Sequence, residues 1–151
     1  MPPDSTHQQQ LETAIATLRL PPGIQVRCWS RADAPAIEHL STRESWSTPA
    51  RRPEATLAAW QNSWPTLVVT EQERVVGFVR GITDGAITLF IAELLVDPIY
   101  RGRGLGRLLL DSCHALFPQT RLDLISTAEA AAFYKAGGFR SIGEGLRRSY
   151  R

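Results

Sequence analysis

A glycine-rich turn carries the clearest chemical signal in the sequence. Residues 101–106 read Arg-Gly-Arg-Gly-Leu-Gly, after a strand that ends at Asp97-Pro98 and before a leucine-rich helix. The first amide N–H groups of a helix have no partner within it, glycine lets the backbone approach a ligand closely, and the helix dipole favours negative charge there. The turn therefore predicts a phosphate-binding site, with Arg101, Arg103 and Arg107 adding positive charge.

Two other phosphate-binding motifs fit this turn poorly. A P-loop needs Gly-Lys-Ser/Thr after its first glycine, and no such run follows. The dinucleotide fingerprint needs a third glycine at the position of Arg107, although Asp123 lies at a suitable distance downstream. An ordinary strand-to-helix turn is the structural alternative.

Glu93 and Tyr134 are the side chains best suited to proton transfer near this turn. Glu93 interrupts a strand face that is otherwise apolar, at positions 87, 89, 91 and 95. A carboxylate inside an apolar run costs free energy unless it is solvated or paired, so a cleft is expected, with a structural ion pair as the alternative. Tyr134 is either an acid in the site or a half-buried helix tyrosine.

The elements that must position these residues alternate in type along the chain. Apolar patterns predict strands at 24–28, 67–70, 75–82, 86–96 and 122–126, and helices at 31–41, 53–62, about 105–117 and 128–136. A hairpin at 71–74 and a turn at Asp84-Gly85 make three of the strands antiparallel. Residues 139–150 are expected to supply one or two closing strands.

Residues 1–23 are predicted to form a separate N-terminal arm, and residues 24–151 the main domain. Asp4 or Ser5 would cap a short helix in the arm, which Pro21-Pro22-Gly23 ends. This arm, together with the tryptophan-rich region 46–64, leads us to expect a homodimer.

Composition excludes several classes of function. Seventeen Lys and Arg against fifteen Asp and Glu give a net charge of only +2 over 151 residues, so nucleic acid is not an expected partner. Cys28 and Cys113 belong to no cluster with metal-ligand spacing, so no metal is expected. No apolar run reaches the roughly 20 residues of a membrane span, and we expect a cytoplasmic protein with no membrane partner.

Two segments of the chain resemble the GNAT family of N-acetyltransferases. LLVDPIYRGRGLGRLLL resembles the family's acetyl-CoA-binding motif, with Arg101, Gly104 and Gly106 at its defining positions. STAEAAAFYKAGGF, residues 126–139, resembles a second family segment, in which Thr127 replaces a common asparagine. The resemblance implies an α/β (α+β) fold: a mixed, mostly antiparallel twisted sheet flanked by about four helices, here with an extra N-terminal helical arm.

The resemblance also implies roles for individual residues. Glu93 would act as general base, often through water, and Tyr134 as the acid that protonates the leaving thiolate. The strand that holds Glu93 would splay from strand 122–126, and the pantetheine arm of acetyl-CoA would fill the gap. The expected cofactor contacts are Leu94, Leu95, Val96, Arg101, Gly102, Arg103, Gly104, Leu105, Gly106, Arg107, Thr127 and Phe133.

The expected activity is transfer of an acetyl group from acetyl-CoA to a primary amine of a small molecule. Trp46, Trp60 and Trp64, with arginines at 43, 51 and 52, would line an aromatic acceptor pocket suited to a small or acid-bearing amine, or else serve as core and interface residues. The alternatives are acetylation of protein N-termini or lysines, a non-catalytic acyl-CoA-binding module, and a structural domain without ligand.

Overall fold

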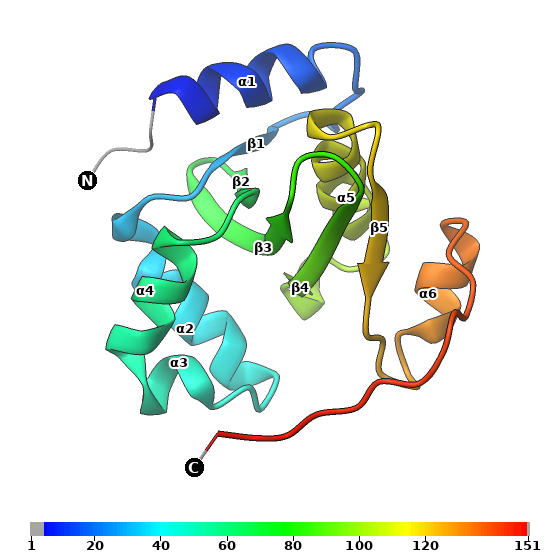
Figure 1. Ribbon diagram of the computed structural model, residues 1–151. Helices are drawn as coiled ribbons and strands as arrows, with labels where there is room; N and C mark the ends of the chain where they lie inside the picture. The colour runs from blue at the N-terminus through cyan, green and yellow to red at the C-terminus, as the bar shows by residue number, and fades with distance from the viewer. Residues whose placement is uncertain (1–4, 151) are drawn as a thin grey trace.

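The computed structural model describes residues 5–150, in which a five-stranded sheet separates two groups of helices (Figure 1). The strands lie in chain order: β1 (Ile24–Cys28), β2 (Thr66–Glu71), β3 (Arg74–Thr83), β4 (Thr88–Val96) and β5 (Arg121–Leu124). The first four are antiparallel neighbours, and β5 runs parallel to β4. This is the mixed, mostly antiparallel sheet that the resemblance implied.

Six α-helices lie around the sheet within the described residues. α1 (Ser5–Ile15) and α5 (Leu105–Leu116) lie on one face, and α2 (Ala34–Arg43), α3 (Thr48–Arg51) and α4 (Pro53–Gln61) lie on the other, while α6 (Ala131–Ala136) stands beyond β5 (Figure 1). Two 3₁₀ turns, η1 (Arg31–Asp33) and η2 (Pro98–Tyr100), precede α2 and the glycine turn. These are the flanking helices and the N-terminal helical arm that the resemblance implied.

The two faces of the sheet bury separate apolar clusters. The leucine stripe of α5 packs on one face, and its Leu109 and Cys113 have no exposed surface. On the other face, Ile37 and Leu40 of α2 and Trp60 of α4 cover Phe78. Burial raises the pKa of the Cys113 thiol, as expected for a core residue and not for a nucleophile.

Helix α1 is packed against the domain through both apolar and polar contacts. Leu11 and Ile15 are buried in the same cluster as α5. The His7 ring stacks on Trp64 with centroids 3.8 Å apart, and Gln8 Oε1 accepts a hydrogen bond from the Cys28 N–H (2.9 Å). The alternative helix cap, Asp4, lies outside the described residues, and the division at residue 23 stays a prediction.

The closing strands expected in residues 139–150 are absent, so this prediction was wrong. The segment leaves α6 and runs back toward α3 without strand pairing (Figure 1). Its apolar residues Ile142 and Leu146 are 66% and 86% exposed, so strand pairing here would bury no apolar face to stabilise it. The tail ends with the Tyr150 ring 4.3 Å from the Arg52 guanidinium carbon.

Candidate active site

A β-bulge in β4 decides which face of the sheet Glu93 occupies. Arg80 pairs with Glu93, but the next residue of β3, Gly81, pairs with Ile91, so Ala92 is the additional residue on β4. The bulge reverses the alternation of side chains. Glu93 therefore lies on the face of α2–α4, together with Leu95, and not on the face where Ile91 packs near α5. The expectation of one continuous apolar face around Glu93 was wrong for this reason.

Beyond the bulge, the outer edge of β4 is open. The ladder between β4 and β5 ends at Ile91 and Leu124, and no strand in the described part of the chain pairs with residues 92–96 on that side. The Asp97 N–H donates to the Val76 carbonyl (2.8 Å), so the antiparallel alternation turns Leu95 toward β3 and leaves the N–H and C=O groups of Leu94 and Val96 facing outward. This is the splay that the resemblance implied.

The glycine turn leads from this edge into α5. Gly102 and Gly104 have φ of +79° and +80°, a left-handed conformation that favours glycine. The first bond of the helix runs from the Leu108 N–H to the Gly104 carbonyl, 2.9 Å. The amides of the preceding residues 105–107 have no partner within the helix, and an anion could accept hydrogen bonds from them.

The arginines of the turn are already paired with carboxylates. Arg101 contacts Glu44 and donates from Nε to the Val96 carbonyl at 3.1 Å. Arg103 lies 3.9 Å from Glu71, and Arg107 lies 3.3 Å from Asp111. Part of the positive charge expected around the turn is therefore balanced, and the backbone amides are the clearer anion-binding groups.

Asp97, which the sequence reasoning missed, fixes the link between β4 and the glycine turn. Its side chain is 1% exposed, and its Oδ1 accepts a hydrogen bond from the Ile99 N–H at 3.0 Å, capping η2. Arg43 and Arg74 approach the other oxygen at 3.4 and 3.8 Å. An Asp-Pro pair at the end of an apolar strand is the sequence signal for such a cap.

We expect the Asp97→Ala substitution to lower the free energy of unfolding by about 1–3 kcal/mol, because it leaves the Ile99 N–H without an acceptor. Urea unfolding followed by fluorescence measures this difference. Asp97→Asn keeps an oxygen for the cap and should recover most of the loss. If the asparagine variant is as unstable as the alanine variant, the loss of stability comes from the lost carboxylate charge and not from the lost cap.

The two sequence segments that resemble GNAT motifs meet where α6 contacts α5. Phe133 packs so closely on Gly106 that a Cβ atom there would lie 3.0 Å from the phenyl ring. Tyr134 is half-buried, with edge contacts to the rings of Phe133 (5.0 Å) and Phe139 (5.5 Å). Burial raises the pKa of Tyr134, so its phenol stays protonated at neutral pH.

Thr127 and Leu105, two other predicted cofactor residues, have structural roles in the fold. The Thr127 hydroxyl accepts a hydrogen bond from the Ala130 N–H (3.3 Å), so a turn precedes α6 and delays its start from the predicted residue 128 to Ala131. Leu105 is 2% exposed and belongs to the core, so only its backbone can contact a ligand.

Glu93 forms an ion pair with Arg80, the residue opposite it on β3. Arg80 Nε donates to Glu93 Oε2 at 2.7 Å, and Arg80 Nη1 donates to the Ser63 hydroxyl at 3.2 Å. The two side chains remain 18% and 24% exposed. Sequence reasoning missed Arg80, although a charge inside the apolar run 75–82 carries the same signal as Glu93.

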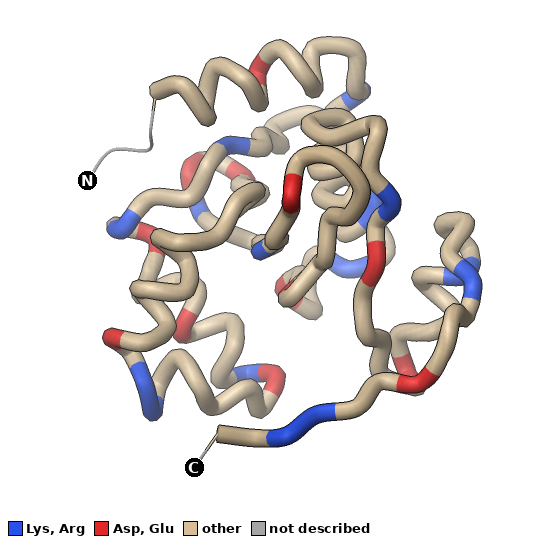
Figure 2. Tube along the Cα trace, viewed as in Figure 1, with Lys and Arg blue, Asp and Glu red and all other residues tan. Residues whose placement is uncertain are grey.

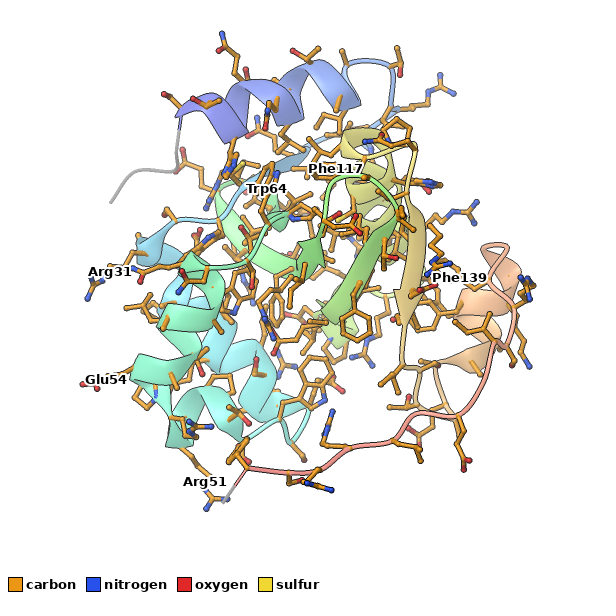
Figure 3. All side chains as sticks on the ribbon, viewed as in Figure 1. Arg31, Arg51, Glu54, Trp64, Phe117 and Phe139 are labelled. Carbon is orange, nitrogen blue, oxygen red and sulfur yellow. The ribbon has the colours of Figure 1, made fainter. Side chains whose placement is uncertain are left out.

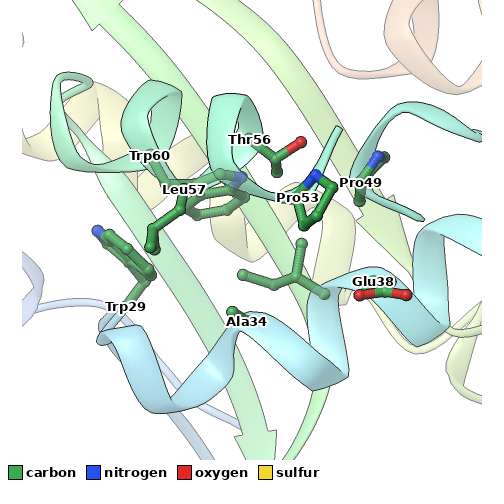
Figure 4. Close-up of a pocket in the computed structure, with 9 residues that line it drawn as sticks. Trp29, Ala34, Glu38, Pro49, Pro53, Thr56, Leu57 and Trp60 are labelled. Carbon is green, nitrogen blue, oxygen red and sulfur yellow. The ribbon is translucent and has the colours of Figure 1, made fainter. Parts of the chain in front are cut away.

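The tryptophans do not gather in one acceptor pocket. Trp60 is a core residue with 2% exposure, Trp64 stacks on His7, and Trp46 is 37% exposed. A small pocket of about 50 Å³ lies between α2 and α4 beside Trp29 and Trp60 (Figure 4). Arg51 and Glu54 point outward from α3 and α4 (Figure 3). The structure favours the core interpretation over the aromatic pocket.

A groove of about 1140 Å³ lies outside β5, between α5 and residues 125–146. Tyr134 and Thr127 line it, and Phe139 lies between α6 and β5 (Figure 3). The groove includes neither the open edge 92–96 nor residues 101–106. Because the groove does not reach the open edge or the glycine turn, it is not assigned to the cofactor.

A sequence model of the GNAT acetyltransferase domain matches residues 62–141, which include the open edge and the glycine turn. The chain belongs to the GNAT family. A histone acetyltransferase of Glycine max, TAP1, is 32% identical over 80 residues, which are 51% of this GNAT chain and 35% of the relative. The match thus spans about a third of that relative's length.

Solved GNAT structures share the fold. A GNAT-family acetyltransferase from Streptococcus pneumoniae superposes with a TM-score of 0.70 at 22% identity, over 85% of this chain and 97% of the other. An acetyltransferase from Trypanosoma brucei gives 0.66 at 23% identity, over 84% and 99%. These likenesses show the fold, and the family implies acetyl-CoA-dependent acyl transfer.

The residues present fit acetyl-CoA as the co-substrate. The amides of the glycine turn can hold its pyrophosphate, and the outward groups of Leu94 and Val96 can pair with its extended pantetheine arm. Within residues 5–150, no group of three or more His, Cys, Asp or Glu is placed to hold a metal ion. The helices of the same residues include none long and apolar enough to cross a membrane.

Proposed function

We propose that the protein is an N-acetyltransferase that transfers the acetyl group of acetyl-CoA to a primary amine of a small molecule. The observation that carries this proposal is the open edge of β4, which lies between Glu93 and the glycine turn. It offers backbone partners for a thioester arm within a few residues of Glu93, whose carboxylate lies on the α2–α4 face of the sheet. Acetyl-CoA supplies the activated thioester carbonyl when bound.

The acceptor must lose a proton before it can attack. An alkylamine with a pKa of about 10.4 is mostly protonated at neutral pH. Glu93 would accept this proton, directly or through water, while Arg80 orients its carboxylate. The outward N–H groups of Leu94 and Val96 can stabilise negative charge on the carbonyl oxygen during attack.

Tyr134 is proposed to supply the proton that the departing thiolate takes up. The C–N bond forms as the C–S bond breaks, and an ammonium plus a thioester give an amide, a thiol and one released proton. The proton on the departing sulfur would come from the Tyr134 phenol, which its raised pKa keeps protonated. Because the leaving thiol has a pKa near that of cysteine, about 8.5, this acid assists only moderately.

Three further expectations belong to this proposal. We place the reaction in the cytoplasm and expect a homodimer. Acceptors in proteins, N-termini or lysines, are the second candidate, favoured by the histone acetyltransferase name of the Glycine max relative. The ion pair of Arg80 and Glu93, whose side chains are only 18% and 24% exposed, favours a small acceptor.

Calorimetry with coenzyme A and a thiol-release screen with acetyl-CoA and an amine panel test the proposal. Coenzyme A should bind, and at least one amine should release thiol well above the hydrolysis rate. Glu93→Gln should lower kcat/KM, with coenzyme A affinity unchanged. Binding without thiol release from any amine or peptide would favour the non-catalytic module, and no binding would overturn both.

A further inference from the structure

The ion pair of Arg80 and Glu93 leaves several hydrogen-bond donors of Arg80 and one carboxylate oxygen of Glu93 unused. Arg80 engages Glu93 only through Nε, and Nη1 reaches Ser63. A guanidinium has five N–H donors, so N–H groups on Nη1 and Nη2 remain. No hydrogen bond from the described part of the chain reaches them or Glu93 Oε1.

A second arginine pair in the molecule shows what a purely structural arrangement looks like. Arg27 holds Asp33 through both Nη atoms, to both carboxylate oxygens, at 2.8 Å each. Asp33 also accepts the Ser30 N–H at 2.7 Å. This bidentate pair has the stronger and more complete geometry. Arg80 and Glu93, by contrast, meet side-on and present an unused donor edge beside an unused acceptor.

The unused groups of Arg80 and Glu93 lie beside the backbone edge that is proposed to hold the thioester. Arg80 and Glu93 lie on the α2–α4 face of the sheet, opposite each other on β3 and β4, where the outer edge of β4 opens. A ligand that contacts Glu93 Oε1 is therefore next to the backbone that would hold the thioester. The same ligand can reach the Arg80 guanidinium, because the two side chains lie within hydrogen-bonding distance of each other.

Several arginines lie at the end of the molecule toward which β4 runs. The Tyr150 ring contacts Arg52 just after α3, and Figure 2 shows basic positions in blue on the tail and at α3, with acidic positions in red on the neighbouring helices. Arginines at this end attract anions and disfavour polyamines. Glu44, an acidic residue of the α2–α3 link, is held by Arg101.

We infer that the acceptor is a small zwitterion: an amine whose carboxylate lies a few bonds away, as in a free amino acid. Its amino group contacts Glu93 Oε1 and its carboxylate binds the unused N–H groups of Arg80. This inference rests on the proposed acetyltransferase activity and adds the acceptor class. Arg80 is then a specificity-determining residue, beyond its role in orienting Glu93.

The test compares free amino acids with their amides by thiol release. The wild-type protein should acetylate at least one amino acid with a kcat/KM about tenfold or more above that of its amide, since the lost charge pairing of a carboxylate is worth at least that. Arg80→Gln should erase the preference by lowering the rate for the acid, and Arg80→Lys should restore part of it. Calorimetry of the preferred amino acid with the coenzyme A-bound protein should show the same ranking.

Arg27→Gln is the matched control, because it removes a structural arginine pair away from the site. It should lower stability and keep the preference for acids. Amides that equal acids in the wild-type protein would overturn the inference while leaving the acetyltransferase activity standing, and so would an Arg80→Gln variant that keeps the preference. Absence of thiol release from every amine would overturn both. The comparison of amino acids with their amides needs no variant, so it tests the preference for a carboxylate even if Arg80→Gln fails to fold.

Discussion

Replacing Gly104 with alanine is expected to weaken coenzyme A binding by about tenfold or more. Gly104 has φ of +80° immediately before α5, and alanine in this left-handed conformation costs roughly 1–2 kcal/mol. Relief of this strain would rotate the amides of residues 105 and 106 away from a common ligand. Since about 1.4 kcal/mol corresponds to a factor of ten in affinity, titration calorimetry will resolve the loss.

Gly85→Ala provides a control with the same backbone strain at a remote turn. Gly85 has φ of +76°, and, as at Gly104, no atom lies within 4 Å of a Cβ built there. Both variants should lose similar free energy of unfolding, but Gly85→Ala should bind coenzyme A like the wild type. Equal weakening in both variants would mean that general destabilisation, and not the turn, explains the effect.

Tyr134→Phe is expected to lower kcat by about 10–100-fold, at the low end of general acid effects because the thiolate is a good leaving group. The affinity for coenzyme A should stay within about twofold, because phenylalanine keeps the ring contacts with Phe133 and Phe139. Steady-state kinetics and calorimetry separate the two quantities. Tyr150→Phe, at an exposed tyrosine far along the tail, should leave kcat unchanged; an equal loss there would discount Tyr134 as the acid.

The pH dependence of stability offers an independent check on Tyr134. Burial raises its pKa above the ordinary value of 10.0, so the folded state holds the phenol proton more tightly than the unfolded chain does. The stability from this proton is fully present below pH 10.0 and is lost as pH rises through the folded-state pKa. The phenylalanine variant should show a smaller loss of stability in this range.

Most of the fold could be predicted because its signals are local. β1 spans the residues that the apolar pattern predicted, 24–28, and the glycine turn marks the start of α5. Phe133 and Gly106 meet because two motifs, distant in sequence, belong to one supersecondary arrangement. These features depend on residue type and spacing, which the sequence states directly.

The remaining features depend on which strands and side chains pair with each other, and the spacing of residues along the sequence does not determine these pairings. A bulge at Ala92 has no mark in composition, yet it moves Glu93 to the other face and opposite Arg80. The choice of Glu44 and Glu71 as partners for Arg101 and Arg103 depends on elements distant in sequence. The tail from residue 139 forms no ladder, although Gly145 packs against the Ile125 side chain just beyond β5.

The unpaired edge of β4 also bears on how the protein behaves in a concentrated solution. The outward N–H groups of Leu94 and Val96 and the Leu94 carbonyl have no strand partner and lie beside apolar side chains, and such an edge is the template on which strands of separate molecules associate. A bound pantetheine arm would cover that template. We therefore expect ligand-free protein to self-associate on concentration and coenzyme A to keep it dispersed, so that the co-substrate acts as a solubility factor for its own enzyme.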